Sequence, residues 1–469
     1  MTPGVRFDYI SQWRHGQVRS KLLQINSRIQ VYLAAGQFIM ILLALNELNL
    51  DYIKGYIEMG KLSNFKKLLD NNTVNTTSEC KYELLEPWIQ WTTVQTGKSF
   101  DDHQVFRLGD MTARPDLHQI FEDLENSGLS VGAISPFNAD NRLKTSKFFI
   151  PDPWTQTKAS GGFIIERLSR TVSRCVNSNA SGKVGPSDII WLLLGCVLYV
   201  RVKRWTKFLR FVSQRKKPGV KAAILDMLLL EVFVTLQKKH KPDYSHLFFN
   251  GGAHVQHHYM FNSSQYKGEI KNPDWYCPSD WDPILMMLET YDTVIGDLLK
   301  SGERIIGVTG LHQVPHEERT FYWRPIAHKD FLVEAGLTGE FNVTPRMSRD
   351  FLIEASSKGQ ASAIEKHLNE FKDSVRDKKV FNVDNRGDSL FVEVVYDEEL
   401  VEGMSFEGPN GISIGDLKYK LAFVAIKNGK HNGLGYVFSN MPMDLPKNIK
   451  LTEVYDFIKR NALADAGIA

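Results

Sequence analysis

The sequence contains few cysteines, and none of them lies in a metal-binding or redox pair. Only four occur among the 469 residues, namely Cys80, Cys175, Cys196 and Cys277. No two of these have the CxxC spacing of zinc knuckles and thioredoxin-type sites, which excludes both kinds of site. Four scattered thiols in a chain of this length are typical of a reducing compartment, and we therefore expect a cytoplasmic protein.

Long hydrophobic runs and a large net charge are also missing. The only early apolar run, Val31 to Leu45, has about 15 residues, whereas a membrane-spanning helix needs about 20; the core of a signal peptide is the alternative interpretation. The net charge is only +3, which gives no reason to expect a nucleic-acid partner. With 43% hydrophobic and 24% charged residues, the composition is globular and excludes a disordered or collagen-like chain.

Apolar runs that end in polar residues recur along the chain and predict an α/β protein. Residues 38–45, FIMILLAL, are typical of a buried parallel strand, and the next 20 or so residues have helical spacing. The same strand-and-polar-tip pattern recurs in HLFFNGGAHVQHH and RIIGVTGLHQVPH, and Asp350 to Lys372 is predicted to be helical. We predict a three-layer α/β sandwich with a central, mostly parallel sheet and a site at the carboxyl ends of its strands.

The chain divides into an N-terminal extension (1–30), an α/β core (31–154 and 241–469) and a helical cap insertion (155–240). Between its two apolar stretches the cap carries nine basic residues without an acid: Arg201, Lys203, Arg204, Lys207, Arg210, Arg215, Lys216, Lys217 and Lys221. This basic face could meet an anionic substrate, an acidic partner or a membrane surface. The alternative is a solvated helix face beside a packed apolar one.

The placement of the histidines predicts a metal site. Several of the 13 histidines follow predicted strands or lie in a Gly-rich loop between strands: His254, His257, His258, His312, His316 and His431. Parallel strands of one sheet bring their carboxyl ends together, so these imidazoles are expected to converge. Neutral imidazole is the commonest protein ligand of zinc, and it also binds iron and manganese.

Seven short motifs resemble those of the alkaline phosphatase superfamily, especially its type I phosphodiesterase, nucleotide pyrophosphatase and sulfatase-like branches. They occur in the family's order, from about residue 38 to about residue 440: GKLSNF (60–65), TG (96–97), DDHQV (101–105), NGGAH (250–254), YDTVIGDLL (291–299), TGLHQ (309–313) and GKHNGLG (429–435). The resemblance implies an alkaline-phosphatase-like fold, divalent metal ions, and action on a phosphate or sulfate ester.

The resemblance also implies ligands, and here the chain departs from the family. The family's first Asp falls on Asn46 or Glu47, the Asp of its D-x-x-x-H motif is Asn250, and the Asp of its S-D-H-G motif is Leu311. His254, His312 and His431 retain the family's histidines. Because fewer carboxylates offset the charge of two ions poorly, we favour one zinc, iron or manganese ion over two, held by the three histidines and a carboxylate that is either Glu47 or Glu86.

The nucleophile of the family is replaced as well. Glu86 stands nearest its position, and the hydroxyls of Thr92 and Thr93 are close by but out of register. His257 and His316 are candidate acid–base catalysts, ligands or groups that orient the ligands.

Three functions remain as hypotheses. The first is a metal-dependent hydrolase or transferase that acts on a small anionic or ester substrate, a phosphate or sulfate ester. The second is a mononuclear metal enzyme with changed chemistry on the same scaffold, with iron as one option. The third is a catalytically inactive protein whose cap binds a partner or a membrane.

Overall fold

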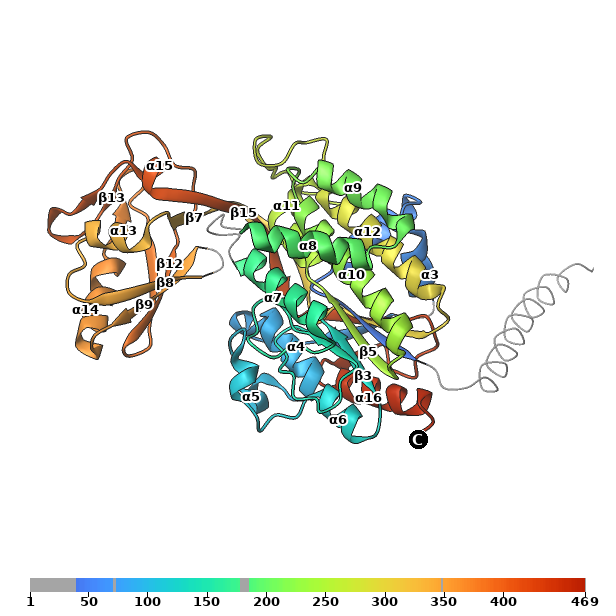
Figure 1. The fold of residues 1–469 in the computed structure, drawn as a ribbon. Coiled ribbons are helices and arrows are strands. Elements are labelled where there is room, and N and C mark those ends of the chain that lie inside the picture. Colours follow the sequence, from blue (N-terminus) through green and yellow to red (C-terminus); the bar gives the residue numbers. More distant parts are fainter. Residues whose placement is uncertain (1–38, 71–72, 178–184, 347–348, 469) are drawn as a thin grey trace, which may run out of the picture.

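The structure is a computed structural model that describes residues 39–70, 73–177, 185–346 and 349–468 (Figure 1). The predicted N-terminal extension, 1–30, lies outside these residues. All four cysteines are free thiols. Among the described helices, none combines the length and the apolar character that a membrane crossing requires.

An eight-stranded sheet forms the centre of the fold, in the order β17-β2-β16-β6-β1-β5-β3-β4. In the described sheet only β16 runs antiparallel to its neighbours, which confirms the predicted mostly parallel α/β architecture. Its strands are β1 (Met40–Leu45), β2 (Thr73–Thr77), β3 (Val131–Ile134), β4 (Phe148–Ile150), β5 (Tyr244–Phe249), β6 (Arg304–Val308), β16 (Leu434–Ser439) and β17 (Asn448–Lys450).

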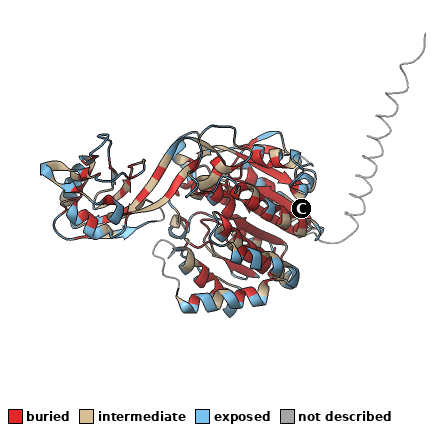
Figure 2. Ribbon diagram, turned by 90° about the horizontal axis from the view of Figure 1, so that it is seen from above, coloured by how far each residue is buried: buried red, intermediate tan, exposed pale blue. Residues whose placement is uncertain are grey.

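The central strand β1 is buried on both faces, which explains its uninterrupted apolar sequence. Leu43 and Leu45 pack into one hydrophobic core, and Leu42 and Ala44 pack into another on the opposite face of the sheet. Figure 2 shows the buried strands between helices whose outer faces are exposed. Helices therefore cover both faces of the sheet, as a three-layer sandwich requires.

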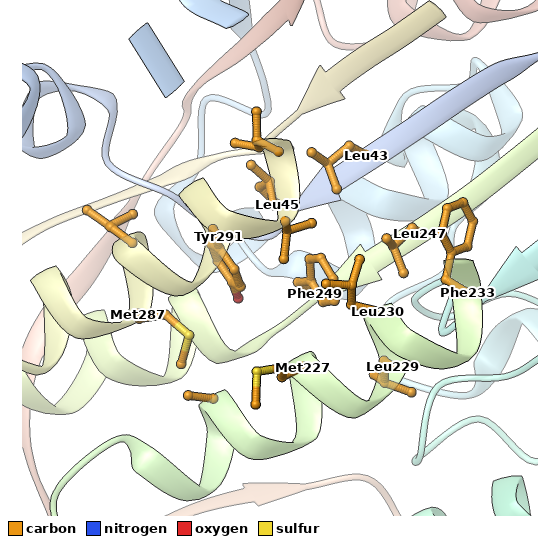
Figure 3. Packing of buried hydrophobic residues seen from close by; sticks show 14 of the residues in the cluster. Leu43, Leu45, Met227, Leu229, Leu230, Phe233, Leu247, Phe249, Met287 and Tyr291 are labelled. Carbon is orange, nitrogen blue, oxygen red and sulfur yellow. The ribbon is translucent and has the colours of Figure 1, made fainter. Parts of the chain in front are cut away.

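Helices of the first layer are α2 (Leu50–Glu58), α3 (Ser63–Leu69), α10 (Val220–His240), α11 (Gly251–Tyr259) and α12 (Pro283–Leu299); those of the second are α4 (Pro87–Thr96), α6 (Ile120–Asn126) and α16 (Glu453–Asp465). Figure 3 shows Leu230 and Phe233 of α10 packed with Leu247 and Phe249 of β5. Of the predicted cap, α10 therefore belongs to the sandwich. Outside it lie α7 (Phe163–Asn177), α8 (Pro186–Tyr199) and α9 (Trp205–Ser213).

A second lobe interrupts the chain after β6. A long antiparallel ribbon of β7 (His312–Pro325) and β15 (Leu421–Asn432) leads to a four-stranded antiparallel sheet with the order β11-β12-β9-β8 (Figure 1). This lobe has its own hydrophobic core. It contains β8 (Phe341–Pro345), β9 (Asp350–Ala355), β11 (Phe381–Asn385), β12 (Ser389–Val394), α13 (His328–Glu334) and α14 (Lys358–Asn369), with short strands β10 (Lys372–Asp373), β13 (Phe406–Glu407) and β14 (Ser413–Ile414).

Two of the sequence motifs contact each other in the structure. The Asp292 carboxylate of the YDTVIGDLL motif accepts hydrogen bonds of 2.8 Å from the backbone N–H groups of Asn64 and Phe65, in the first turn of α3. It also accepts one of 2.9 Å from the Asn64 side chain. These bonds satisfy donors that have no partner within the helix.

Replacing Asp292 with Ala should therefore destabilise the protein by about 2–4 kcal/mol, because several buried donors lose a charged acceptor. Urea unfolding measures this free energy. Asp51→Ala, which removes a carboxylate from an exposed ion pair on α2, is the control and should have little effect. Equal losses in the two variants would contradict the capping role of Asp292.

A second buried carboxylate, Asp226 on α10, should make stability depend on pH. It accepts hydrogen bonds from the Gly251 N–H and the Tyr291 hydroxyl, and burial raises its pKa from an ordinary value near 3.8 to about 7. The Asp226 carboxyl therefore loses its proton more readily in the unfolded chain than in the folded protein. As a result, the free energy of unfolding falls as pH rises from about 4 to about 7.

The Asp226→Asn variant lacks this titration. Relative to the parent protein it should gain up to about 4 kcal/mol of stability between pH 4 and pH 8, since one pKa unit corresponds to about 1.4 kcal/mol. Urea unfolding at several pH values measures the difference. Parallel stability curves for the two proteins would show that Asp226 does not titrate in this range.

Candidate metal centre

The site lies where β1 ends, beside the ends of β5 and β6. The ends of the neighbouring strands hold the residues after β1 in place. The Asn46 N–H donates to the Phe249 carbonyl, and the Glu47 N–H donates to the Thr309 carbonyl. Glu47 has a φ of 59°, a left-handed conformation that side-chain-bearing residues adopt rarely and often at functional sites. The turn directs the end of β1 toward the helix that follows β5.

Three side chains from distant parts of the chain meet at this tip. Glu47 Oε2 is 3.0 Å from His257 Nε2 and 3.2 Å from His431 Nε2. The two Nε2 atoms are 3.3 Å apart. His257 lies on α11, which begins directly after β5, and His431 lies near the end of β15. Glu47 is buried, whereas one third of the His257 side chain is exposed, so the group opens to solvent.

The triangle of these three atoms has the size of one metal site. Ligand atoms about 2.1 Å from one ion are separated by about 3.0 Å at right angles and about 3.4 Å at the tetrahedral angle. The three measured distances fall within or at the edges of this interval. Two imidazoles and one carboxylate are also a donor set that zinc, iron and manganese accept. The residues therefore fit a single divalent ion with positions left for water or substrate.

The electrostatics of the group favour a carboxylate that keeps its charge. Burial alone would raise the pKa of Glu47, but the adjacent His431 and His257 outweigh it and hold the pKa well below its usual range. Burial would likewise lower the pKa of His431, yet the charge of Glu47 raises it overall. The buried Glu47 carboxylate and the His431 imidazole thus stabilise each other's charge.

Amide side chains fix the Glu47 carboxylate by hydrogen bonds. Gln313 Nε2 donates to Glu47 Oε2 and Asn46 Nδ2 donates to Glu47 Oε1 over 3.0 Å. Asn46 also donates to Asn250 Oδ1 over 2.8 Å and accepts from the Trp91 indole over 2.7 Å. The side chains at two of the family's carboxylate positions therefore bind each other, and Asn46 is a positioning residue for Glu47 where the sequence suggested a ligand.

Two of the predicted histidine ligands do not join the group. His254 lies on α11 with His257, but its ring contacts His258, one helical turn away, with centroids 4.9 Å apart. The buried His312 is held by a 2.6 Å hydrogen bond between its Nδ1 and the Leu434 carbonyl. Among the described residues, only Glu47, His257 and His431 form a cluster able to hold a metal ion.

Glu86, the residue nearest the family's nucleophile position, lies beside the cluster. It is the last residue before α4, its side chain does not cap that helix, and its Oε2 is 3.7 Å from His431 Nδ1. Burial, reinforced by Glu47 and opposed by His431, raises the pKa of Glu86 to about 7. About one third of its side chain is exposed, so a molecule at the site can reach it.

The remaining candidates are not brought to the site. Thr92 and Thr93 are buried within α4, and their hydroxyls donate to the carbonyls of Trp88 and Ile89, one turn back. A hydroxyl engaged in this way is not poised to attack a substrate. His316, on the ribbon, lies 3.2 Å from the Thr320 hydroxyl and 3.6 Å from the exposed Glu317 carboxylate.

Comparisons with known proteins give similar folds at very low sequence identity. No family model and no protein of curated function matches the sequence. Phosphonoacetate hydrolase of Sinorhizobium meliloti bound to phosphonoformate is 12% identical, with 91% of this chain and 96% of that chain covered and a TM-score of 0.43. Human ectonucleotide pyrophosphatase/phosphodiesterase 5 is 10% identical, with 91% and 95% covered and a TM-score of 0.40.

TAB5 alkaline phosphatase, in a mutant form with magnesium bound, is 10% identical, with 92% and 99% covered and a TM-score of 0.37. What this site can do follows from its own residues.

Proposed function

We propose that this protein is a metal-dependent hydrolase or transferase that acts on a phosphate or sulfate ester at a single divalent ion. The observation that carries the proposal is the convergence of Glu47, His257 and His431 on one point, with the Glu86 carboxylate beside it. A bound ion would polarise an ester oxygen and stabilise the negative charge that develops on it during attack. The other contributions come from the chain itself.

Glu86 is the residue placed to handle a proton. The Glu86 carboxylate is near Nδ1 of His431, whereas Glu47 is near Nε2 of the same ring. The two carboxylates therefore lie on opposite sides of the His431 ring. A carboxylate in this position can accept the proton of an attacking water or alcohol. Since Thr92 and Thr93 are turned into α4, we propose attack by water assisted by Glu86 in place of attack by a protein hydroxyl.

Cations close to Glu86 suit an anionic substrate. The charge of Lys427 acts on the Glu86 carboxylate, and Lys430, three residues along the same strand, is paired with the exposed Glu317. The positive end of α4 also lies at Glu86. Together they would attract a phosphate or sulfate group to the cluster and orient it there.

A second candidate function rests on the ligand set alone. Two histidines and one carboxylate with open positions are also the set that mononuclear iron enzymes use. Elemental analysis of the purified protein separates the two: one equivalent of zinc or manganese favours the ester hydrolase, whereas one equivalent of iron favours redox chemistry.

Hydrolysis of nitrophenyl esters tests the proposed function directly. Phosphate monoesters, phosphate diesters and sulfate esters should be assayed with the metal-loaded protein, and at least one class should be cleaved. Treatment with a chelator should abolish this activity, and one equivalent of the ion should restore it. A metal-loaded protein that cleaves none of the three classes, or one whose activity survives complete metal removal, would overturn the proposal.

A further inference from the structure

Helix α8 presents a wholly apolar face to solvent. Six side chains at the spacing i, i+1, i+4, i+5, i+8 and i+9 are all exposed: Ile189, Ile190, Leu193, Leu194, Val197 and Leu198. At 3.6 residues per turn this spacing forms one continuous stripe. Leu193 and Val197, at the centre, are 60% and 68% exposed.

Further exposed apolar side chains occur on α7, on α9 and between α8 and α9. Phe163 and Ile164 of α7, Val202, and Leu209 and Val212 of α9 are exposed as well. The Phe163 ring contacts that of Trp191 on α8, with centroids 6.1 Å apart. We call these eleven exposed side chains of residues 163–212 the apolar cap face. Soluble monomers rarely expose a continuous apolar surface of this kind without a binding role.

The position of α8 explains why no other described part of the chain covers this face. Helix α10 packs on β5 and β3, and α8 packs on α7 and α10, one layer farther from the sheet (Figure 1). The inner side of α8 is the packed one: Gly195 lies against Leu168 of α7, and Cys196 is buried. The helix is thus anchored by one side while its aliphatic side faces outward.

Positive charge lies beside the α7 and α9 parts of the apolar cap face. No Asp or Glu occurs between residues 189 and 225. Arg210, Arg215 and Lys216 are exposed beside Leu209 and Val212, and within the described part of the chain none of the three has a carboxylate within ion-pair distance. Arg167 lies over the Phe163 ring.

Other cap cations are engaged within the protein. Arg201 and Arg204 pair with the buried Glu231 and with Asp297, and Lys203 also pairs with Asp297. The basic cap predicted from the sequence is therefore divided. One group of cations holds α9 and α10 to α12, and a second group remains at the edge of the apolar cap face.

We propose that the apolar cap face docks on a lipid bilayer that contains anionic headgroups. Aliphatic and aromatic side chains with Arg and Lys beside them suit a membrane interface, where the acyl chains take up the apolar side chains and the phosphates bind the cations. The 14 residues of α8 span only about 21 Å, so the helix lies along the surface. A second copy of the chain fits less well, because an isologous contact would bring the same cations together.

Vesicle flotation tests the proposal with the full chain. The double variant Leu193→Glu/Val197→Glu places charges on the face without touching a buried residue, and Arg210→Gln/Arg215→Gln removes two of the cations. Val333→Glu is the matched control, since Val333 is also exposed on a helix but lies on α13 in the second lobe. Circular dichroism and metal content check that each variant is folded.

The parent protein and Val333→Glu should float with vesicles of phosphatidylcholine and about one-third phosphatidylserine. Leu193→Glu/Val197→Glu should bind at least about tenfold less, and Arg210→Gln/Arg215→Gln should lose the preference for anionic over neutral vesicles. Absence of binding by the parent protein, or equal binding by the Leu193→Glu/Val197→Glu variant, would overturn the proposal. So would a parent protein that forms dimers through this face and ignores vesicles.

Discussion

His257→Ala should abolish stable metal binding, whereas His254→Ala, on the same helix, should leave it intact. The two residues differ by less than one helical turn, but only His257 reaches Glu47 and His431. Removal of a direct ligand should weaken binding by more than about 100-fold, because even the loss of a hydrogen-bonding partner of a ligand costs 10–100-fold. Elemental analysis after gel filtration, with titration of zinc or manganese into the apoprotein, measures the effect.

Two further variants complete this test. Glu47→Gln keeps the shape of the side chain but loses its charge, and His431→Ala removes the third corner of the triangle; both should behave like His257→Ala. His254→Ala is a suitable control because His254 is exposed on α11. Equal metal loss in His254→Ala and His257→Ala would mean that the ligand set was assigned wrongly.

Glu86→Gln should lower kcat by about 100- to 10,000-fold while the protein keeps its metal ion. This is the range expected when a positioned general base is lost, and Gln is nearly isosteric with Glu. The metal ligands remain, so metal content should match that of the parent protein and KM should change much less than kcat. Steady-state kinetics on the best ester of the panel measure the effect.

A Thr92→Val variant provides the matched comparison for this result. Thr92 lies on α4, the helix that begins directly after Glu86, and its hydroxyl is used within the helix. Its loss should cost stability but leave kcat within a few fold of the parent value. A large drop in kcat for Thr92→Val together with a small one for Glu86→Gln would reverse the proposed assignment of the reacting groups.

Several parts of this site could be predicted from the sequence. The apolar run of β1 located the strand, and its first polar residues, Asn46 and Glu47, mark the tip of the sheet. His431 was found in the same way, from its place between two apolar stretches. The sequence left the carboxylate ligand open between Glu47 and Glu86, and it is the structure that places Glu47 against both imidazoles.

The choice among the other histidines could not be made from the sequence. Residues 250–258 were interpreted as a polar tip, but α11 begins at Gly251, immediately after β5. On a helix the direction of each side chain depends on its angular position, so His254, His257 and His258 point in different directions. His312 was expected at the site because it follows β6, yet it forms a hydrogen bond with the Leu434 carbonyl next to it in space.

The second lobe was missed for a related reason. The segment Asp350 to Lys372 was predicted to be helical, and this is correct only for α14; Asp350–Ala355 is the strand β9, which pairs with β8 and β12. Short strands in a small antiparallel sheet are defined by partners far along the chain, which single-sequence periodicity does not reveal. The sequence GKHN around His431, predicted as a loop, is likewise extended because β7 pairs with it.

The paired amides at the family's carboxylate positions bear on the number of ions. Asn46 donates to Asn250 Oδ1, and Trp91 donates to Asn46 Oδ1, so both side-chain oxygens already have partners. Among the described residues no second cluster of potential ligands occurs. These contacts support our proposal of a single ion over two.

Anomalous X-ray diffraction from crystals soaked in manganese or zinc tests this central claim most directly. One peak is expected, about 2.1 Å from Glu47 Oε2, His257 Nε2 and His431 Nε2. A peak bound by His254 or His312, or two peaks about 4 Å apart, would contradict it.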